Sequence, residues 1–497
     1  MDDLPATRTQ GDDVRPDWRY LSVLLIAAAV LRLYRLSDDS LWYDEILSER
    51  RATAPLNDAH DLLRNGTHPP GYSQAILRPW LALGNGEWMQ RFPSVVFGVA
   101  TVAMTAVLGT RLAGRRAGLA AAALLAVMPL HLYYSREGRM YALLALVLLG
   151  WVMALIRARE RDTTLDWTVY ALLGAASLYT HYYAGFTILA VVGTTAVLEL
   201  RHGFTTRTRR WLIATLGIGM LFAPWLPTFQ DQLNNETFLG WLPPLTLDGL
   251  IALPVQFFIG FEEDVTTRAD IWSVGIVALI ILFRFSVQQL HSNAAGSPDA
   301  AFTGAVIGAA FAGPVLLALI ASEVRPLVFV RYFVGVLPFL AILIGAALTR
   351  LRPVPVIAFS TLFAVATLHA VPIINDAWRP AFRDATDRIE QDHPDDVIVV
   401  FVDLDFSLSP YYGLLYYLDE AYHTVEYNDS GHNGGFAAFL DNLETTASRT
   451  WVLQAGKAPV IFDDPPGFVT SVQEEYGSHY FYDSFTIRIA ALDRDTR

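Results

Sequence analysis

The sequence predicts a polytopic α-helical membrane protein of about 11 spans, followed by a C-terminal extracytoplasmic α/β domain. Of its 497 residues, 53% are hydrophobic and only 17% are charged, whereas a soluble protein carries about a quarter charged residues. Apolar runs of about 20 residues recur from Tyr20 to Ile374, and such runs can cross the hydrocarbon core of a bilayer. Beyond this region the pattern changes to that of a water-soluble domain.

The expected spans follow the apolar runs. The stretch 166–200 is too long for one crossing, so the polar THYY at 180–183 is expected to divide it. The spans are about 20–36, 92–112, 117–134, 140–156, 166–181, 183–200, 211–227, 271–285, 302–321, 333–349 and 354–373.

Arginine placement predicts the orientation of these spans, because cytoplasmic loops carry an excess of Lys and Arg. With a cytoplasmic N-terminus, the short basic loops all lie inside, and an odd number of spans places the C-terminal domain outside. These loops contain Arg115, Arg116, Arg157, Arg159, Arg161, the segment 201–210, Arg284, Arg350 and Arg352.

The chain then divides into three parts. Residues 1–19 are expected to be a cytoplasmic segment, too acidic for a signal peptide, so that the first apolar run is retained. Residues 20–373 form the transmembrane domain. Its first external loop, about 37–91, has the pattern of two or three short interfacial helices. A second external stretch, LDGLIALPVQFFIGF within 228–270, is expected to lie along the membrane surface.

Residues 374–497 form the extracytoplasmic domain. DDVIVVFVD, RTWVLQAG and DSFTIRIAAL have the pattern of strands, and AFRDATDRIEQ that of an amphipathic helix. Positions 371–497 contain 22 acidic and 8 basic residues, a balance of −14, which argues against a nucleic-acid partner. The absence of cysteine from the sequence excludes disulfides and a thiol nucleophile.

With this topology, the unusual polar clusters all lie at the outer ends of apolar spans. Charges this close to hydrocarbon cost free energy, so they pair with one another or face a cavity. The inner loops carry mostly arginine, and this asymmetry indicates a single external site assembled from several loops. The clusters are Asp44 with Glu45, HPPGY at 68–72, YSREGRMY at 134–141, YTHYY at 179–183, and Glu323, Arg325, Arg331 and Tyr332 in SEVRPLVFVRYF.

These residue types suit sugar transfer from a polyprenyl phosphate. A carboxylate can deprotonate an acceptor hydroxyl or amine. Arginines can bind a phosphate bidentately and stabilise the charge that grows on it as a leaving group. Tyrosine, tryptophan and histidine can line a sugar site, and the reactive phosphate of such a donor lies at the membrane interface.

The order WYDE, HPPGY, YSREGRMYAL, YTHYYAGF and RYFVGVLPFL resembles the membrane glycosyltransferases of the C superfamily (GT-C). The group concerned is related to protein O-mannosyltransferases and aminoarabinose transferases, often called family 39. The resemblance covers about 20–350. It implies an enzyme that uses a polyprenyl-phosphate-linked sugar outside the cytoplasm, with a glycan, lipid or protein as acceptor and inversion at the sugar carbon.

The resemblance also implies roles for single residues. Asp44 would activate the acceptor, with Glu45 beside it, and Glu137 would be a second carboxylate of the site. The donor phosphate would be bound by Arg136, Arg139, Arg325, Arg331 and Tyr332, and the remaining substrate contacts would come from His68, Tyr72, His181 and Tyr182.

Two departures from the family pattern bear on these roles. His68 stands where aminoarabinose transferases tend to have a lysine, and the WWDYG signature of oligosaccharyltransferases is absent from the sequence. En bloc transfer to asparagine is therefore not expected. No metal-ligand set has convincing spacing; Glu45, His68 and His181 could ligate one divalent ion only if the fold brought them together, and the cofactor stays unknown.

Simpler interpretations exist for each cluster. Asp44 and Glu45 suit the solvated start of a helix, where acidic residues are favoured. Arg136, Glu137 and Arg139 could form a local ion pair. His68 could serve a structural turn, because the residue before a proline is held extended, and His181 with Tyr182 could belong to a belt of interfacial aromatics.

Two other classes of protein are also compatible with the sequence. A transporter or flippase for a lipid-linked glycan would carry charges midway along its spans and interrupted helices. A non-catalytic scaffold would carry outer-loop residues that do not converge. Because the charges cluster at the outer ends, the sequence favours the enzyme.

Overall fold

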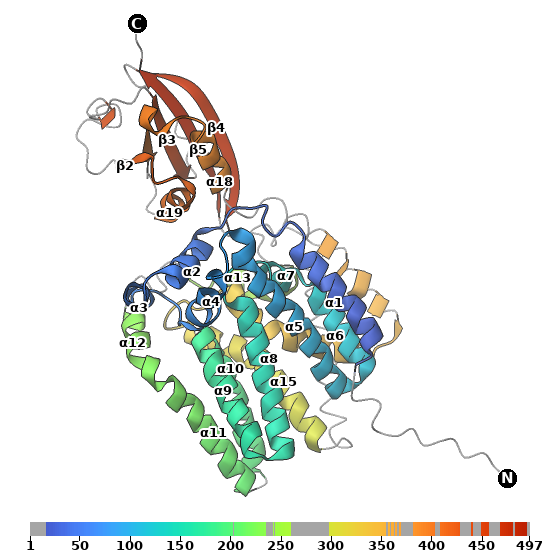
Figure 1. The fold of residues 1–497 in the computed structure, drawn as a ribbon. Coiled ribbons are helices and arrows are strands. Elements are labelled where there is room, and N and C mark those ends of the chain that lie inside the picture. Colours follow the sequence, from blue (N-terminus) through green and yellow to red (C-terminus); the bar gives the residue numbers. More distant parts are fainter. Residues whose placement is uncertain are drawn as a thin grey trace, which may run out of the picture. The chain divides into compact units, whose positions relative to one another are not determined.

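The computed structural model describes residues 16–201, 203–234, 242, 244–259, 298–353, short pieces of 356–368, 381–402, 408–427, 439–440, 449–456, 468–480 and 483–494. The chain separates into two compact units (Figure 1). One comprises Met1–Tyr34 and Glu49–Val371, and the other Arg35–Ser48 and Pro372–Arg497. Helix α2 (Tyr43–Thr53) contains the boundary at Ser48.

The first unit is helical, and the apolar runs of the sequence become its helices. Within the described part of the chain, five helical segments are long and apolar enough to cross a membrane. Expected span 271–285 lies outside the described residues and 354–373 is described only in pieces, so the number of spans stays a prediction. The helices are α1 (Trp18–Leu33), α3 (Leu56–Arg64), η1 (Gly71–Leu77), α4 (Arg78–Leu81), α5 (Glu87–Ala113), α6 (Arg115–Val127), α7 (Pro129–Tyr134), α8 (Tyr141–Arg161), α9 (Thr164–Thr180), α10 (Ala184–Leu200), α11 (Thr206–Phe222), η2 (Ala223–Trp225), α12 (Leu226–Asn234), α13 (Leu247–Ile259), α15 (Pro298–Ala321), η5 (Val330–Val336) and α16 (Leu337–Leu348).

The expected run 117–134 is divided into two helices. Helix α6 ends at Val127 and α7 begins at Pro129, with Met128 in an extended conformation between them. Proline lacks the N–H that a continuous helix needs and disfavours a helical conformation in the residue before it. The buried Arg32 of α1 stabilises this break: its Nη1 donates to the Ala126 carbonyl at 3.0 Å, and its Nη2 to His131 Nδ1 at 2.9 Å.

Small residues let the central helices approach closely. A β-carbon at Gly118 of α6 would lie 2.4 Å from the carbonyl oxygen of Ala106 on α5, and one at Gly345 of α16 would lie 2.6 Å from that of Ala117. Helices α5, α6, α8 and α16 pack together, as the parallel ribbons of Figure 1 show in part. Because lipid is as apolar as the core, close packing at small residues is a main source of helix association in a membrane.

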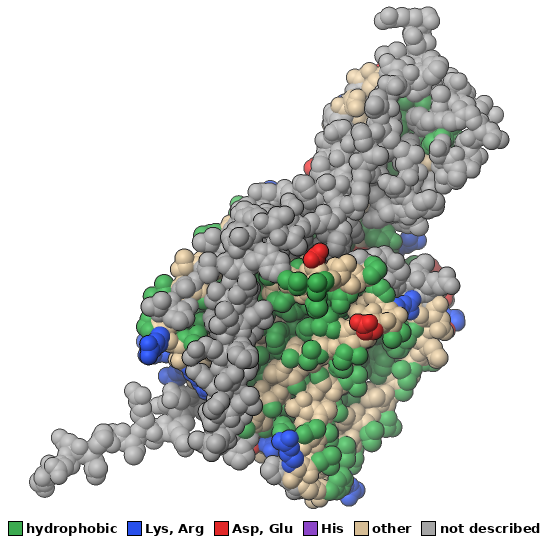
Figure 2. All heavy atoms as spheres, turned by 180° about the vertical axis from the view of Figure 1, so that it is seen from behind, with side chains coloured by type: hydrophobic (Ala, Val, Ile, Leu, Met, Phe, Trp, Pro, Cys, Tyr) green, Lys and Arg blue, Asp and Glu red, His purple; other side chains and the backbone are tan. Residues whose placement is uncertain are grey.

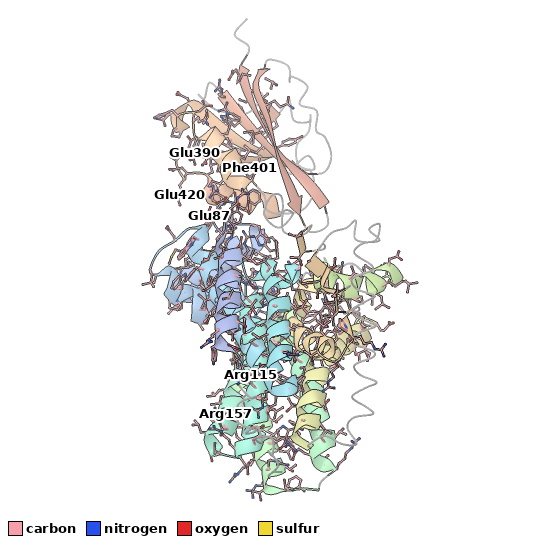
Figure 3. All side chains as sticks on the ribbon, turned by 90° about the vertical axis from the view of Figure 1, so that its right-hand side faces the viewer. Glu87, Arg115, Arg157, Glu390, Phe401 and Glu420 are labelled. Carbon is pink, nitrogen blue, oxygen red and sulfur yellow. The ribbon has the colours of Figure 1, made fainter. Side chains whose placement is uncertain are left out.

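The described outer surface of this unit is apolar, as expected for contact with lipid. Figure 2 shows hydrophobic side chains over most of the described surface on one face, with arginines near its margins. Ile26, Leu216 and Met220 expose 65%, 67% and 75% of their surface. Figure 3 shows Glu87, which begins α5, at one end of the unit, and Arg115 and Arg157 towards the other.

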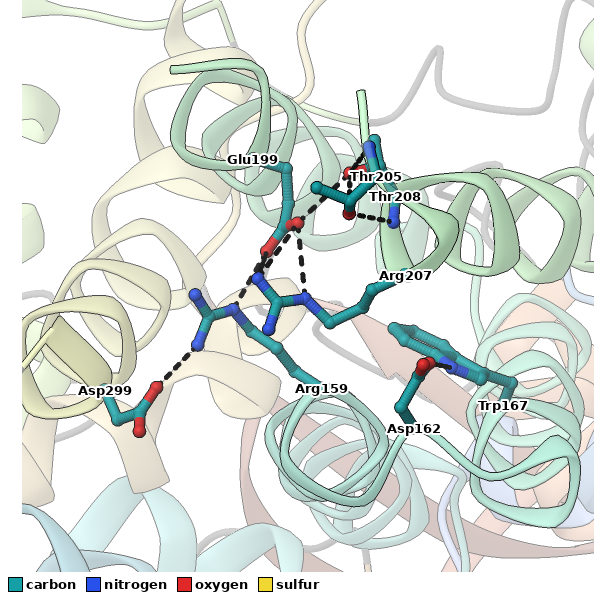
Figure 4. A network of polar contacts seen from close by, with 8 residues as sticks. All are labelled: Arg159, Asp162, Trp167, Glu199, Thr205, Arg207, Thr208 and Asp299. Atoms are coloured by element: carbon teal, nitrogen blue, oxygen red, sulfur yellow. Dashed lines mark hydrogen bonds and ion pairs between the residues drawn. The ribbon is translucent and has the colours of Figure 1, made fainter. Parts of the chain in front are cut away.

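A buried carboxylate joins four helices at the end where the basic loops lie (Figure 4). Glu199 of α10 is 3% exposed and contacts Arg159 of α8 at 2.9 Å and Arg207 of α11 at 3.4 Å. Arg159 also contacts Asp299 of α15 at 2.7 Å. Two arginines thus neutralise a carboxylate that would be costly to bury alone.

The second unit contains a five-stranded sheet of order β2-β1-β3-β5-β4. Strand β1 pairs in parallel with β2 and β3, whereas β5 pairs antiparallel with β3 and β4. The expected strands coincide with β1, β3 and β5, and the expected helix with α18. Strands β2 and β4 and helix α19 are additional. The elements are α18 (Phe382–Ile389), η6 (Pro394–Asp396), β1 (Val397–Val402), α19 (Leu408–Tyr417), β2 (His423–Tyr427), β3 (Arg449–Gly456), β4 (Phe468–Tyr480) and β5 (Asp483–Arg494).

The sheet and its helices share an apolar core. Phe382 of α18 packs with Val399 and Trp451 on one face of the sheet. At the margin, Arg449 contacts Asp392 at 3.0 Å and Asp493 at 2.7 Å. Hydrogen bonds to these two carboxylates raise the pKa of the Arg449 guanidinium.

Candidate functional site

Two histidines from distant motifs lie together in the helical unit. The ring centroids of His68, in HPPGY, and His181, in YTHYY, are 5.7 Å apart. His181 follows the last residue of α9, and His68 precedes η1. The two motifs contact each other where the backbone of Gly71 packs against the backbone of Tyr179. The fold therefore brings together two of the substrate contacts that the sequence predicted.

The hydrogen bonds of His181 leave one of its ring nitrogens as a donor. Its Nδ1 accepts a hydrogen bond from the Tyr183 backbone N–H at 3.1 Å, so in the neutral ring the proton is on Nε2. The residue is 4% exposed, and no described residue accepts a hydrogen bond from that Nε2. A buried donor without an acceptor is costly, and a bound ligand would remove the cost.

Tyrosine rings surround His181. The ring centroids of Tyr141, Tyr183 and Tyr332 lie 5.7, 5.5 and 5.3 Å from that of the imidazole. The Tyr183 hydroxyl donates to the carbonyl of Leu327, which connects the start of α10 to the segment before η5. His181 is thus surrounded by flat amphipathic rings, a type of surface on which sugar rings pack.

Buried arginines supply the positive charge of this region. Arg139 is 2% exposed, and its Nη2 lies 3.5 Å from His68 Nε2. Arg331 is 7% exposed, with its guanidinium 4.7 Å from the centroid of the Phe329 ring. A β-carbon at Gly66 would lie 2.9 Å from Nη2 of a third arginine, Arg51 of α2, which places that guanidinium beside the loop that carries His68.

Burial and these charges keep both histidines neutral. Burial, followed by Arg139 and Arg331, lowers the pKa of His181 to about 3. The pKa of His68 lies well below its ordinary value, first through burial and then through Arg139, His181, Arg51 and Arg331. The electrostatic potential at both rings is therefore positive, which favours an anionic ligand.

The YSREGRMY loop is held in place by residues of η1 and α5. The Tyr72 hydroxyl donates to Ser94 Oγ at 3.2 Å, and Ser94 Oγ donates to the carbonyl of Arg139 at 3.2 Å. A β-carbon at Gly138 would lie 2.6 Å from Gln90 Cγ, so α5 packs directly against the loop. Tyr72, predicted as a substrate contact, is thus connected to the Arg139 backbone through Ser94, and its contact with substrate stays a prediction.

Glu137 lies in the same region as Arg331. Its side chain is fully buried, and its charge and that of Arg331 act with opposite sign on the Tyr134 hydroxyl. The rings of Tyr134 and Tyr141 are 4.7 Å apart, and the ring of Tyr141 is next to His181. Tyr134 thus lies within the electrostatic reach of a carboxylate and an arginine from different loops.

Three of the predicted contacts are engaged in other interactions. Arg136 donates to the carbonyl of Tyr34 at 2.8 Å, and Arg325 donates to that of Leu233 at 3.0 Å. The Tyr182 hydroxyl contacts Gln232 Oε1 at 2.5 Å and accepts from Trp225 Nε1 at 2.9 Å. These contacts connect helices, and substrate binding by the three residues stays a prediction.

Asp44 and Glu45 lie in the first turn of α2, within the segment that belongs to the second unit. Glu45 is fully buried, and its Oε2 accepts from the Trp42 backbone N–H at 3.3 Å. This is the reach of an N3 glutamate back to the start of its helix. Asp44 is half-buried, and its carbonyl accepts from Ser48 Oγ at 2.8 Å. Glu45 thus contributes to the start of its helix, and the catalytic roles expected for Asp44 and Glu45 both stay predictions.

Sequence reasoning missed four residues around the two histidines: Arg51, Tyr134, Tyr141 and Tyr183. Both Tyr134 and Tyr141 flank the predicted YSREGRM loop, and Tyr183 ends the YTHYY motif, so the motifs contained them. Arg51 had no distinguishing signal, because it lies among ordinary charges in SERR. In the part of the chain that the structure describes, no three His, Asp or Glu side chains are grouped to hold a metal ion.

Comparison with known families identifies one match. Residues 67–227, about a third of the chain, match the family described as dolichyl-phosphate-mannose-protein mannosyltransferase. The matched region contains His68, Arg139 and His181 and ends before Arg331. No curated protein sequence matches the chain.

Solved structures show the same fold at low sequence identity. ArnT from Cupriavidus metallidurans in the apo state has a TM-score of 0.58 at 12% identity, and the match covers 95% of this chain and 98% of ArnT. ArnT bound to undecaprenyl phosphate has a TM-score of 0.56 at 14% identity with the same coverage. AglB from Archaeoglobus fulgidus, in complex with an inhibitory peptide and a dolichol-phosphate, has a TM-score of 0.50 at 12% identity and is matched over 69% of its length by 88% of this chain. The predicted resemblance to GT-C proteins is confirmed.

Proposed function

We propose that this protein is an integral-membrane glycosyltransferase that moves a sugar from a polyprenyl-phosphate-linked donor to an acceptor on the extracytoplasmic face. The acceptor is a glycan, lipid or protein, and the sugar carbon is inverted. The observation that carries the proposal is the His181 Nε2–H, for which no described residue provides an acceptor, within the electrostatic reach of Arg139 and Arg331.

A phosphate fits this group of residues. The positive potential at both imidazoles favours an anion, and the His181 N–H supplies a donor that an oxygen can accept. Arginine binds phosphate oxygens through two parallel hydrogen bonds, which the compact ammonium of lysine cannot do. The same donors stabilise the charge that develops on the phosphate as the glycosidic bond breaks.

The positions of these residues on the helices indicate that the donor carries a lipid. Arg139 lies just before α8, His181 just after α9, and Arg331 in η5 just before α16. Under the proposed topology these are all outer ends of spans, at the depth of lipid headgroups. A polyprenyl chain would stay in the bilayer while its phosphate reaches the arginines. The solved relatives ArnT and AglB hold undecaprenyl phosphate and dolichol-phosphate.

The reaction needs a base as well as a phosphate site. In the proposed mechanism the acceptor attacks the sugar C1, polyprenyl phosphate leaves, and a carboxylate takes the acceptor's proton. The family resemblance assigns that step to Asp44, with Glu137 as a second carboxylate. The proposed orientation has a cytoplasmic N-terminus and an external C-terminal domain.

Binding of a polyprenyl monophosphate to the purified protein in lipid nanodiscs tests the proposal. We expect R139Q and R331Q to weaken binding by at least about tenfold, because each removes a charge-assisted contact. R210Q is a matched control, since Arg210 is exposed, pairs with Asp162 at 2.9 Å and has no predicted role in binding. Equal affinity of R331Q and R210Q would remove the phosphate site from this part of the fold.

A further inference from the structure

The two histidines are held in different tautomers. His181 offers its Nε2–H, because the Tyr183 backbone N–H occupies Nδ1. His68 is held in the other tautomer: Arg139 can only donate, so His68 Nε2 accepts, and the ring proton lies on Nδ1. That Nδ1–H donates to Thr67 Oγ1 at 2.7 Å.

The His68 ring therefore lies within the electrostatic reach of three arginines. Arg139 precedes α8, Arg331 lies on η5 and Arg51 lies on α2, and the charge of each lowers the pKa of the ring. His181, between α9 and α10, is neutral and would repel a second protonated ring. The distance of 3.5 Å from Arg139 Nη2 to Nε2 is at the limit of a hydrogen bond.

A phosphate oxygen and the lone pair of a neutral imidazole repel each other. A proton on Nε2 would convert that lone pair into a donor and turn the repulsion into a charge-assisted hydrogen bond. The negative charge of the phosphate would at the same time offset the arginines, whose charge adds to the effect of burial in lowering the pKa of the empty ring.

We propose that His68 takes up a proton at Nε2 when the donor phosphate binds and returns it to the phosphate oxygen that leaves the sugar. This inference rests on the proposed function. It makes His68 a general acid for the leaving group, in addition to a contact for the phosphate.

The step balances as follows. The C1–O bond to the phosphate breaks, and its electron pair goes to the phosphate oxygen, which takes the Nε2 proton of His68. The products are the monoanionic polyprenyl phosphate and neutral His68. The acceptor oxygen forms the new bond to C1, and its proton goes to the carboxylate base. Without the proton from His68, the departing phosphate would carry two negative charges.

Proton linkage to binding is the direct test. The probe is a polyprenyl methyl phosphate, a phosphodiester with a single charge that does not titrate near neutrality. Titration calorimetry in two buffers with different ionisation enthalpies, between about pH 5.5 and about pH 8, measures the protons taken up per probe bound. We expect uptake of up to about one proton, with an affinity that falls by up to about tenfold per pH unit as pH rises.

Two variants identify the group that takes the proton. H68K carries a permanent charge, so we expect it to bind the probe with no net proton uptake. H68Q cannot be protonated, so we expect weaker binding and again no uptake. H181Q is the matched control, since it removes the other imidazole of the site and should weaken binding while proton uptake persists.

The outcomes separate this inference from the proposed function. Tight binding by the wild type without proton uptake would overturn the role of His68 and leave the phosphate site standing. Uptake that persists in H68Q would place the proton on another group and also overturn it. Failure of the wild type to bind either the probe or a polyprenyl monophosphate would overturn both proposals.

Discussion

A β-carbon at Gly71 would lie 2.4 Å from the carbonyl oxygen of Tyr179. The first residue of η1 therefore contacts the last turn of α9 only because it has no side chain. This contact lies three residues after His68 and two residues before His181 in their respective segments. The distance of 5.7 Å between the two imidazoles depends on it.

G71A should separate the two histidines. Backbone atoms lie opposite the added methyl group, and they cannot move aside as a flexible side chain could. We expect a loss of about 1–3 kcal/mol in unfolding free energy and a loss of phosphate affinity larger than that instability explains. Affinity for a polyprenyl monophosphate, measured on the folded fraction, checks this. G193A is the control, because a β-carbon at Gly193 would meet no described atom within 4 Å.

The Glu199 network predicts a different kind of defect. E199Q leaves Arg159 and Arg207 without the carboxylate between them, and breaking a buried ion pair costs about 3–5 kcal/mol. Because Arg207 and Asp299 are partly solvated, we expect the lower end of that range. Unfolding in detergent measures the loss, and phosphate affinity of the folded protein should not change.

D162N is the matched control for E199Q. Asp162 pairs with Arg210 at 2.9 Å, and both side chains are about one third or more exposed, so the pair contributes less than about 1 kcal/mol. Asparagine keeps an oxygen for Trp167 Nε1 and tolerates the left-handed backbone at this position, where φ is 51°. If the unfolding free energy of E199Q were no lower than that of D162N, the Glu199 network would not contribute to the stability of the fold.

Acid should destabilise the helical unit through the two histidines. In the unfolded chain a histidine has a pKa of about 6.5, whereas the pKa of His181 in the fold is about 3 and that of His68 is also strongly lowered. Between these values the unfolded state binds the proton and the folded state does not. Unfolding free energy therefore falls as pH drops below about 6.5, by up to about 1.4 kcal/mol per pH unit for each ring.

H181Q isolates this effect from the titration of carboxylates. Its unfolding free energy should fall less steeply with acid than that of the wild type, and the two curves should converge at low pH. Unfolding in detergent at several pH values between about 4.5 and about 7.5 gives both curves. Parallel curves would show that His181 is protonated equally easily in both states.

The helices could be predicted because a helix that contacts both lipid and the protein core is apolar on all sides. Its residue range can therefore be read from the sequence, although its packing partners cannot. The break at Met128 could also have been found, since Pro129 follows it directly. Strand β4 could not: FVTSVQEEYGSHY is an edge strand with few apolar residues, so its composition resembles that of a loop.

The residues of the candidate site can be predicted from the sequence, but their pairings cannot. The sequence indicates His68, Arg139, His181 and Arg331 because each is a polar residue next to an apolar run, and their contacts with substrate stay predictions. Arg136 and Arg139 lie three residues apart in one loop, and nothing in the sequence tells which of them faces His68. The fold decides this through the backbone: Ser94 binds the carbonyl of Arg139, while Arg136 turns to that of Tyr34.

Substitutions of the two adjacent carboxylates of WYDE, Asp44 and Glu45, should have different effects on stability and on sugar transfer. Glu45 accepts the Trp42 N–H at the start of α2, so E45Q should lower unfolding free energy by about 1 kcal/mol and leave transfer intact in the folded protein. D44N should abolish transfer and leave stability unchanged, if Asp44 takes the acceptor's proton. Mass spectrometry of surface glycoproteins and lipid-linked glycans, in cells that carry each variant in place of the wild type, detects loss of a single-sugar increment. Unaltered transfer by D44N would remove Asp44 from the mechanism and leave Glu137 as the carboxylate to examine.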